Sequence, residues 1–97
     1  MEYTTEIVEN LLRNYYSLQQ HPDSTFSFYF LDLTNSLRVL ERNSPVLHST
    51  IVNVFVNGMP IQEKAEQDGV SRMQVNRRLY DGLDVLTMIM NGELYAG

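Results

Sequence analysis

The sequence predicts an all-α fold, a compact bundle of about five helices that ends in a helix-turn-helix. Apolar residues recur every three or four positions along most of the chain, and proline or glycine separates the segments. The most β-branched segment has no obvious partner strand. With 97 residues, 43% of them apolar, we expect a single domain, residues 1–97. Residues 1–57 are its amino-terminal helices, and residues 58–91 are the helix-turn-helix with an extended recognition helix.

The first expected helix covers residues 5–20. Its apolar stripe has spacings of four, four and three and consists of Ile7, Leu11, Tyr15 and Leu18, widened by Val8 and Leu12. The segment His21-Pro22-Asp23-Ser24 ends it, because a residue before proline avoids the helical region. Tyr15 and Tyr16 are interpreted as core rings rather than as a base-stacking surface.

The second expected helix lies within residues 26–40. Its seam repeats at spacings of four, three, four and three and consists of Phe26, Phe30, Leu33, Leu37 and Leu40. The opening F-S-F-Y-F alternates as a strand would, but we favour a helix from about Phe28. Ser44 is expected to cap the next helix, with Pro45 at its first position.

Residues 48–56 are the most ambiguous segment. The run I-V-N-V-F-V locally prefers a strand. An unpaired buried strand would leave backbone groups without hydrogen bonds. We therefore expect a helix that faces inward with Leu47, Ile51, Val54 and Phe55, and that closes at Asn57-Gly58.

The segment from Ile61 to Leu86 has the spacing of a helix-turn-helix. A short helix is expected over residues 61–68, followed by Gly69, whose lack of a side chain permits the positive φ of a tight turn. Val70 would plug the turn, and Ser71 would cap the second helix. The small Ala65 would face Val75 and Leu79. The second helix of such a motif normally lies in a DNA major groove.

The second helix has an apolar stripe and a basic outer face. The stripe consists of Val75, Leu79, Leu83 and Leu86. Arginine, glutamine and asparagine match base edges, and arginine also neutralises phosphate. The predicted DNA contacts are Ser71, Arg72, Gln74, Asn76 and Arg77, with Arg78 and Lys64 as anchors on the DNA backbone. The alternative interpretation is a basic face that only meets solvent.

The net charge of −5 is unusual for a DNA-binding domain. The charge is unevenly distributed: residues 59–80 hold four bases and three acids, whereas residues 81–97 hold three acids and no base. Local potential governs docking, so DNA binding is compatible with this balance, but non-specific affinity is expected to be weak.

Three groups of residues follow a known family pattern. Leu31-Asp32-Leu33 resembles its Asp-Leu helix, and Asn57-Gly58-Met59-Pro60 resembles its glycine turn. Ten residues match its helix-turn-helix, roughly Q-E-E-I-A-E-E-L-G-V-S-R-x-T-V-N-R-R-L, position by position: Ala65, Gly69, Val70, Ser71, Arg72, Val75, Asn76, Arg77, Arg78 and Leu79. Residues 28 to 91 thus resemble the phage late-transcription regulators of the ArpU and RinA type, which are themselves similar to the fourth region of bacterial sigma factors. The resemblance implies a DNA-binding transcriptional regulator encoded by a phage or prophage.

Two residues depart from that pattern. Lys64 stands where the family has a core isoleucine, and Asp68 stands where it has a leucine. Lysine can reach solvent over its apolar stem, whereas a buried aspartate needs a donor such as a turn amide. These departures keep a second function open, an acidic protein-binding module that inhibits or recruits a host protein such as RNA polymerase or a nuclease. Its surface would be the carboxyl-terminal tail or the amino-terminal helix with Glu2, Glu6 and Glu9.

Other classes are disfavoured by the sequence. Neither His21 nor His48 has a ligand partner three or four residues on, and no nucleophile or phosphate-loop motif is present, so we expect no enzyme, metal or cofactor. There is no cysteine, and no apolar run approaches the roughly 20 residues that span a bilayer. The acidic amino terminus is unlike a signal peptide. A cytoplasmic protein is expected.

The last helix also predicts a homodimer. Beside the stripe from Val75 to Met90, the residues Val85, Met88 and Ile89 form a second apolar stripe with no obvious internal use. A symmetric dimer would place two recognition helices about one DNA turn apart. The alternative is that the first helix covers this stripe in a monomer.

Overall fold

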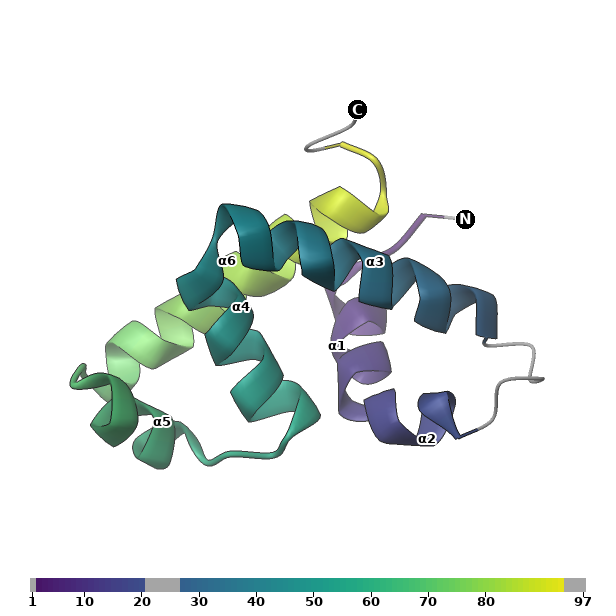
Figure 1. Cartoon of the computed structure of the whole chain (residues 1–97). Helices are drawn as coiled ribbons and strands as arrows, with labels where there is room; N and C mark the ends of the chain where they lie inside the picture. Colours follow the sequence, from purple (N-terminus) through teal and green to yellow (C-terminus); the bar gives the residue numbers. More distant parts are fainter. Residues whose placement is uncertain (1, 21–26, 94–97) are drawn as a thin grey trace.

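The computed structural model describes residues 2–20 and 27–93, and these residues form helices and no strand (Figure 1). In order they are α1 (Thr5–Arg13), α2 (Tyr15–Gln19), α3 (Ser27–Asn43), α4 (Pro45–Ile51), the π-helical segment η1 (Val52–Val56), α5 (Ile61–Asp68) and α6 (Arg72–Met90). The all-α prediction is confirmed. The prediction of about five helices is close, since six α-helices are present among the described residues.

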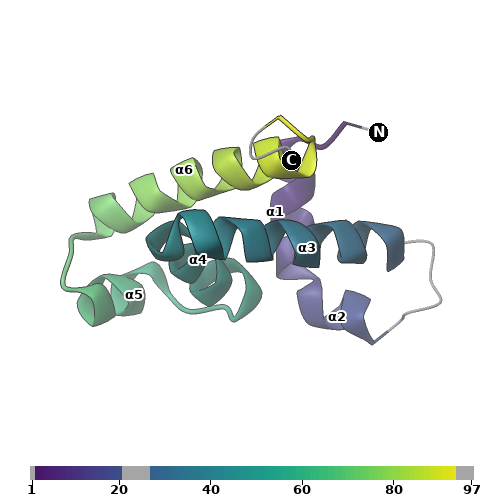
Figure 2. The same ribbon diagram turned by 45° about the horizontal axis from the view of Figure 1, so that its top comes forward.

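The long helix α6 is packed along α3, and α4 crosses beneath both (Figure 2). The predicted inward stripe of α6 is confirmed, because Val75, Leu79, Leu83 and Leu86 are all buried. Gly82 allows a close approach between α6 and α4. A Cβ at Gly82 would lie only 2.5 Å from Cδ1 of Ile51. The buried apolar residues form one cluster that includes Val8, Leu12, Leu33, Leu37, Leu40, Ile51 and Phe55 from the other helices.

The first expected helix is divided in two at Asn14. The Asn14 backbone leaves the helical region with φ −105° and ψ 17°, and its side chain donates to the carbonyl of Asn10 at 2.7 Å. This competition between an asparagine side chain and the helix ladder explains the break. Tyr15 is half-buried as expected, but the core assignment of Tyr16 is wrong, because that side chain is exposed. The predicted stop at His21-Pro22-Asp23-Ser24 lies outside the described residues, as does Phe26.

The ambiguous segment of residues 48–56 is helical, as predicted, but it is not a regular α-helix throughout. Its last five residues form the π-helical segment η1, in which the Asn57 amide donates to the carbonyl of Val52 at 3.0 Å. Ser44 and Pro45 precede and open α4 as expected, although the Ser44 hydroxyl makes no capping hydrogen bond.

The segment of residues 2–4 that precedes α1, called the strap below, is hydrogen-bonded to the carboxyl-terminal end of α6. The Tyr3 amide donates to Oδ1 of Asn91 at 2.7 Å, and Nδ2 of Asn91 donates back to the Tyr3 carbonyl at 2.9 Å. The Tyr3 hydroxyl donates to Asp32 on α3 at 2.8 Å. Burial, reinforced by this hydrogen bond to Asp32, raises the pKa of Tyr3 well above its ordinary value. None of the described helices has the length and apolar content to cross a membrane.

Candidate nucleic-acid interface

The turn between α5 and α6 has the geometry that the sequence predicts. Gly69 adopts the left-handed conformation with φ 67° and ψ 34°, and the amide of Val70 donates to the Ala65 carbonyl at 3.0 Å. Only glycine adopts this conformation at little cost. The Ser71 hydroxyl accepts from the Gln74 amide at 3.1 Å and caps α6. The two helices therefore meet through a turn of three residues.

The inner sides of α5 and α6 are packed against the common core. Ala65, Val75 and Leu79 are buried, and Val70 is half-buried against the same cluster. The small side chain of Ala65 allows the helices to approach each other. In Figure 1, α5 and the first half of α6 form one end of the molecule, distant from the strap and from α1. The outer side of α6 is thus available to a large partner.

Three of the predicted DNA contacts are exposed on the first two turns of α6. Arg72, Asn76 and Arg77 are exposed, and no ion pair or hydrogen bond joins the two guanidinium groups to another described side chain. Gln74 is half-buried, and the Ser71 hydroxyl is already engaged as the cap. The first turn of α6 also borders a shallow depression together with Ile61 and Gln62 of α5. Two arginines and an amide therefore project from one rigid helix.

Two other exposed side chains of α6 are not among the predicted DNA contacts. Met73 is 74% exposed and Tyr80 is 72% exposed. They lie three or four residues from Arg77 on either side, which is the spacing of neighbours on one helix face. Their positions off the apolar stripe were readable in the sequence, so helical spacing was the signal that could have included them.

The role predicted for Lys64 as a DNA backbone anchor is wrong. Lys64 is only 2% exposed. Its ammonium group donates to Oγ of Ser49 at 2.9 Å and to Oε1 of Gln67 at 3.3 Å, and it lies 3.2 Å from Oδ1 of Asp68. An ammonium group has three donors, and each has an acceptor here. Lys64 therefore joins α5 to α4 instead of reaching solvent.

The expectation for Asp68 also needs correction. Its side chain is 23% exposed, and its donors are side chains instead of a turn amide. One oxygen faces Lys64, and the other lies 3.5 Å from the guanidinium of Arg78. Arg78 is half-buried and already paired with this carboxylate, so it is not a free anchor for a DNA phosphate. Lys64, Asp68 and Arg78 form a charged cluster that fixes α5 against α6.

The prediction that Val85, Met88 and Ile89 form an apolar stripe with no internal use is wrong for two of these three residues. Val85 and Ile89 are partly buried against the protein's own core, and only Met88 is exposed. The amino-terminal helix α1 also contacts α6. The second apolar stripe therefore has an internal use, which removes the reason given for the homodimer and favours the alternative of a monomer.

The histidine that the structure describes, His48, is half-buried, with Nδ1 3.8 Å from Oε2 of Glu41. His21 lies outside the described residues. Within residues 2–20 and 27–93, no three histidine, aspartate or glutamate side chains come together as a metal site would require.

The chain matches no protein-family model, and comparison with curated proteins and with solved structures finds no significant match. The resemblance to phage late-transcription regulators therefore depends on the residues quoted above for it.

Proposed function

We propose that the chain is a DNA-binding transcriptional regulator of phage or prophage origin, acting in the cytoplasm. In this proposal α5 and α6 are a helix-turn-helix, and α6 enters the major groove of double-stranded DNA. The observation that supports it most is that Arg72 and Arg77, with Asn76, are exposed on the first half of α6, and that neither arginine forms an ion pair with a described side chain. Arginine reads guanine and asparagine reads adenine through two hydrogen bonds each.

No described acidic side chain pairs with Arg72 or Arg77, and this matters because the chain is acidic overall. At a net charge of −5, a basic side chain that is already paired adds little to the attraction for phosphate. Lys64 and Arg78 are paired within the charged cluster and leave the set of proposed DNA contacts. With the Ser71 hydroxyl engaged as the cap, the remaining set is Arg72, Gln74, Asn76 and Arg77, with Met73 and Tyr80 as exposed apolar neighbours on α6. Met73 could contact a thymine methyl group.

The direct test is a duplex-selection experiment followed by binding to the selected duplex, measured by fluorescence anisotropy. The double variant Arg72→Ala/Arg77→Ala should lose specific binding, because both side chains lie on the proposed reading face. A matched control is Arg38→Ala/Arg42→Ala, which removes the same charge from two exposed arginines on α3 that form no ion pair with any side chain the structure describes. The control should bind nearly as the parent does. Equal losses in both variants would mean that bulk charge, and not α6, determines binding.

A second candidate function is the acidic protein-binding module. Glu2 precedes α1 and Glu6 lies in its first turn, and both are exposed, which favours a basic partner surface such as one on a host polymerase or nuclease. Glu9 is less available, since it pairs with Arg13 at 2.9 Å. Retention of a host protein by the parent chain, lost in Glu2→Gln/Glu6→Gln and kept in Arg72→Ala/Arg77→Ala, would support this candidate over DNA binding.

A further inference from the structure

A groove of about 520 Å³ lies between α2, α3 and the continuous helix of α4 and η1. No residue of α5 or α6 lines it, so it is separate from the proposed DNA-binding face. Its volume falls within the range of roughly 300–1,000 Å³ that holds small ligands in proteins. Figure 1 shows the helices that contribute its lining, α2, α3 and α4 with the η1 segment that continues it.

The side of the groove formed by α2 and α3 is aromatic. The ring centroids of Tyr15 and Phe30 are 5.1 Å apart, and Tyr16 meets Tyr15 edge to face at 5.5 Å. The side formed by η1 is aliphatic, with Val52 and Val56. Aromatic faces on one side and branched aliphatic groups on the other suit a flat apolar ring between them.

The π-helical segment shapes the aliphatic side. Its wide turn brings Val52, Val56 and Asn57 onto the same wall of the groove. The Tyr16 hydroxyl donates to Oδ1 of Asn57 at 2.7 Å and holds α2 against the end of η1. A π-helical turn has poorer hydrogen-bond geometry than an α-helical one and is frequent at functional sites.

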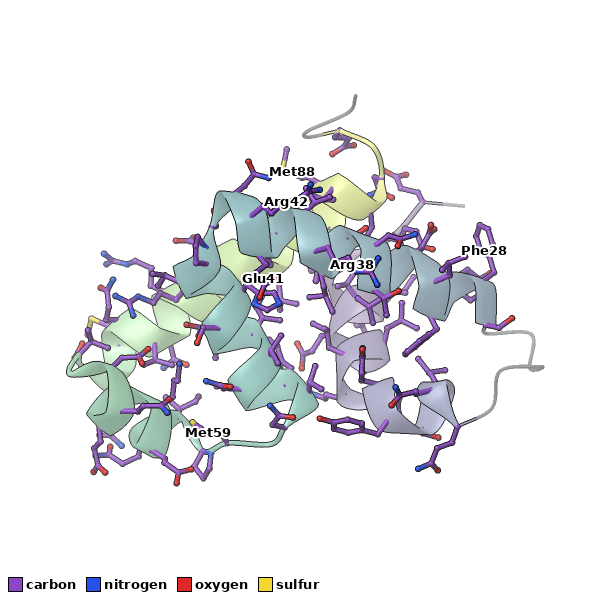
Figure 3. The ribbon with its side chains drawn as sticks, viewed as in Figure 1. Phe28, Arg38, Glu41, Arg42, Met59 and Met88 are labelled. Atoms are coloured by element: carbon purple, nitrogen blue, oxygen red, sulfur yellow. The ribbon has the colours of Figure 1, made fainter. Side chains whose placement is uncertain are left out.

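Charged groups lie on the α3 side of the groove. Arg38 is exposed and lines the groove, and no described side chain forms an ion pair or hydrogen bond with it. Three residues on, Glu41 projects beneath α3 toward α4, where it meets His48 (Figure 3). A guanidinium group binds a carboxylate through two parallel hydrogen bonds. Glu41 would repel a second negative group on the ligand, so the lining of the groove favours a ligand with a single negative group.

We infer that this groove binds a small planar aromatic monocarboxylate, with its ring between the tyrosine and valine walls and its carboxylate on Arg38. This site is independent of the proposed DNA binding, because the two share no residue.

The probe for the test is 1-naphthoate, a flat ring system with one carboxylate. Its neutral counterpart is 1-naphthalenemethanol. The chain has no tryptophan, so tyrosine is its main source of protein fluorescence beside that of the probe. Naphthoate should bind on the order of tenfold tighter than the alcohol, the expected gain from one charge-assisted pair. A chain with net charge −5 does not attract anions in general, so this preference would indicate a specific cation.

Substitutions on α3 test whether Arg38 is the cation that binds the carboxylate of the probe. Arg38→Gln should weaken naphthoate binding about tenfold and leave binding of the alcohol unchanged. Arg42→Gln is the matched control, because Arg42 lies on the upper side of α3 in Figure 3 and does not line the groove. Glu41→Gln should tighten binding of naphthoate, since it removes a like charge. Circular dichroism confirms that each variant is folded.

Three results would overturn the inference. The first is equal affinity for naphthoate and the alcohol, and the second is an Arg38→Gln variant that binds naphthoate as the parent does. The third comes from amide chemical-shift mapping on the parent chain. Shifts that cluster at Val52, Val56 and Asn57 would support the groove, whereas shifts confined to α6 would place the probe elsewhere.

Discussion

The charged cluster of Lys64, Asp68 and Arg78 offers a quantitative test of how α5 is held against α4 and α6. Replacing Asp68 with alanine leaves the Lys64 ammonium buried with only Ser49 and Gln67 as acceptors. Removing one partner of a buried ion pair typically costs about 3–5 kcal/mol. We expect about 3 kcal/mol, the low end, because two neutral acceptors remain and the carboxylate is itself partly exposed.

Replacing Lys64 with methionine has a different expected result. Methionine keeps the apolar stem in its buried position and removes the charge. The acceptors left behind are partly accessible to water, and Asp68 still faces Arg78. The free energy of unfolding should therefore change by less than about 1 kcal/mol, as exchanges of buried ion pairs for apolar residues often do.

The two substitutions together form a double-mutant cycle measured by urea denaturation. Asp68→Ala should cost about 2 kcal/mol less in the Lys64→Met background than in the parent, since no buried charge is then stranded. Glu66→Ala is the control on the same helix, an exposed carboxylate whose loss should change stability by no more than about 0.5 kcal/mol. Equal costs of Asp68→Ala in both backgrounds would refute the coupling between Lys64 and Asp68.

Three further predictions concern packing, pH and assembly. Gly82→Ala should destabilise the fold by about 1–2 kcal/mol, because the new Cβ meets the fully buried Ile51, and thermal denaturation should show partial recovery when Ile51→Val is added. The raised pKa of Tyr3 means that the folded state favours the neutral phenol. The contribution of this phenol to the free energy of unfolding is therefore fully present below the ordinary tyrosine pKa of 10.0 and is lost as the pH rises above it. Tyr3→Phe should lose less stability than the parent over that alkaline range in pH-dependent urea melts; an identical decline would contradict the assignment. Because Val85 and Ile89 pack internally, we expect sedimentation of the free chain to give one species of 11.3 kDa, whereas a species of twice that mass, dissociated by Met88→Asp, would support the homodimer.

Local signals predicted the secondary structure well. Helical spacing identified the buried stripe of α6, and single residues fixed the turn: Gly69 has the positive φ and Ser71 the capping hydrogen bond. These features depend on residues only a few positions apart, so the sequence contains nearly all the information needed.

Contacts between residues far apart in the sequence could not be predicted from helical spacing or from single turn residues. Burial of Lys64 requires Ser49, which lies fifteen residues earlier on another helix. The strap depends on Asn91, eighty-eight residues from Tyr3. The π-helical turn of η1 also has no local signal, because its β-branched residues would as readily form a strand. For the candidate interface, helical spacing identified exposed residues of α6 but could not separate the paired Arg78 from Arg72 and Arg77, which form no ion pair with a described side chain.

The central proposal is that Arg72 and Arg77 on α6 contact DNA, and the salt dependence of duplex binding tests it most directly. Each arginine that neutralises a phosphate contributes about 0.9 to the slope of log affinity against log salt concentration. The proposal predicts that Arg72→Ala/Arg77→Ala lowers the magnitude of the slope by up to about two units, and that Arg38→Ala/Arg42→Ala leaves it unchanged. A parent chain without salt-dependent duplex binding, or a slope that Arg72→Ala/Arg77→Ala does not alter, would contradict it.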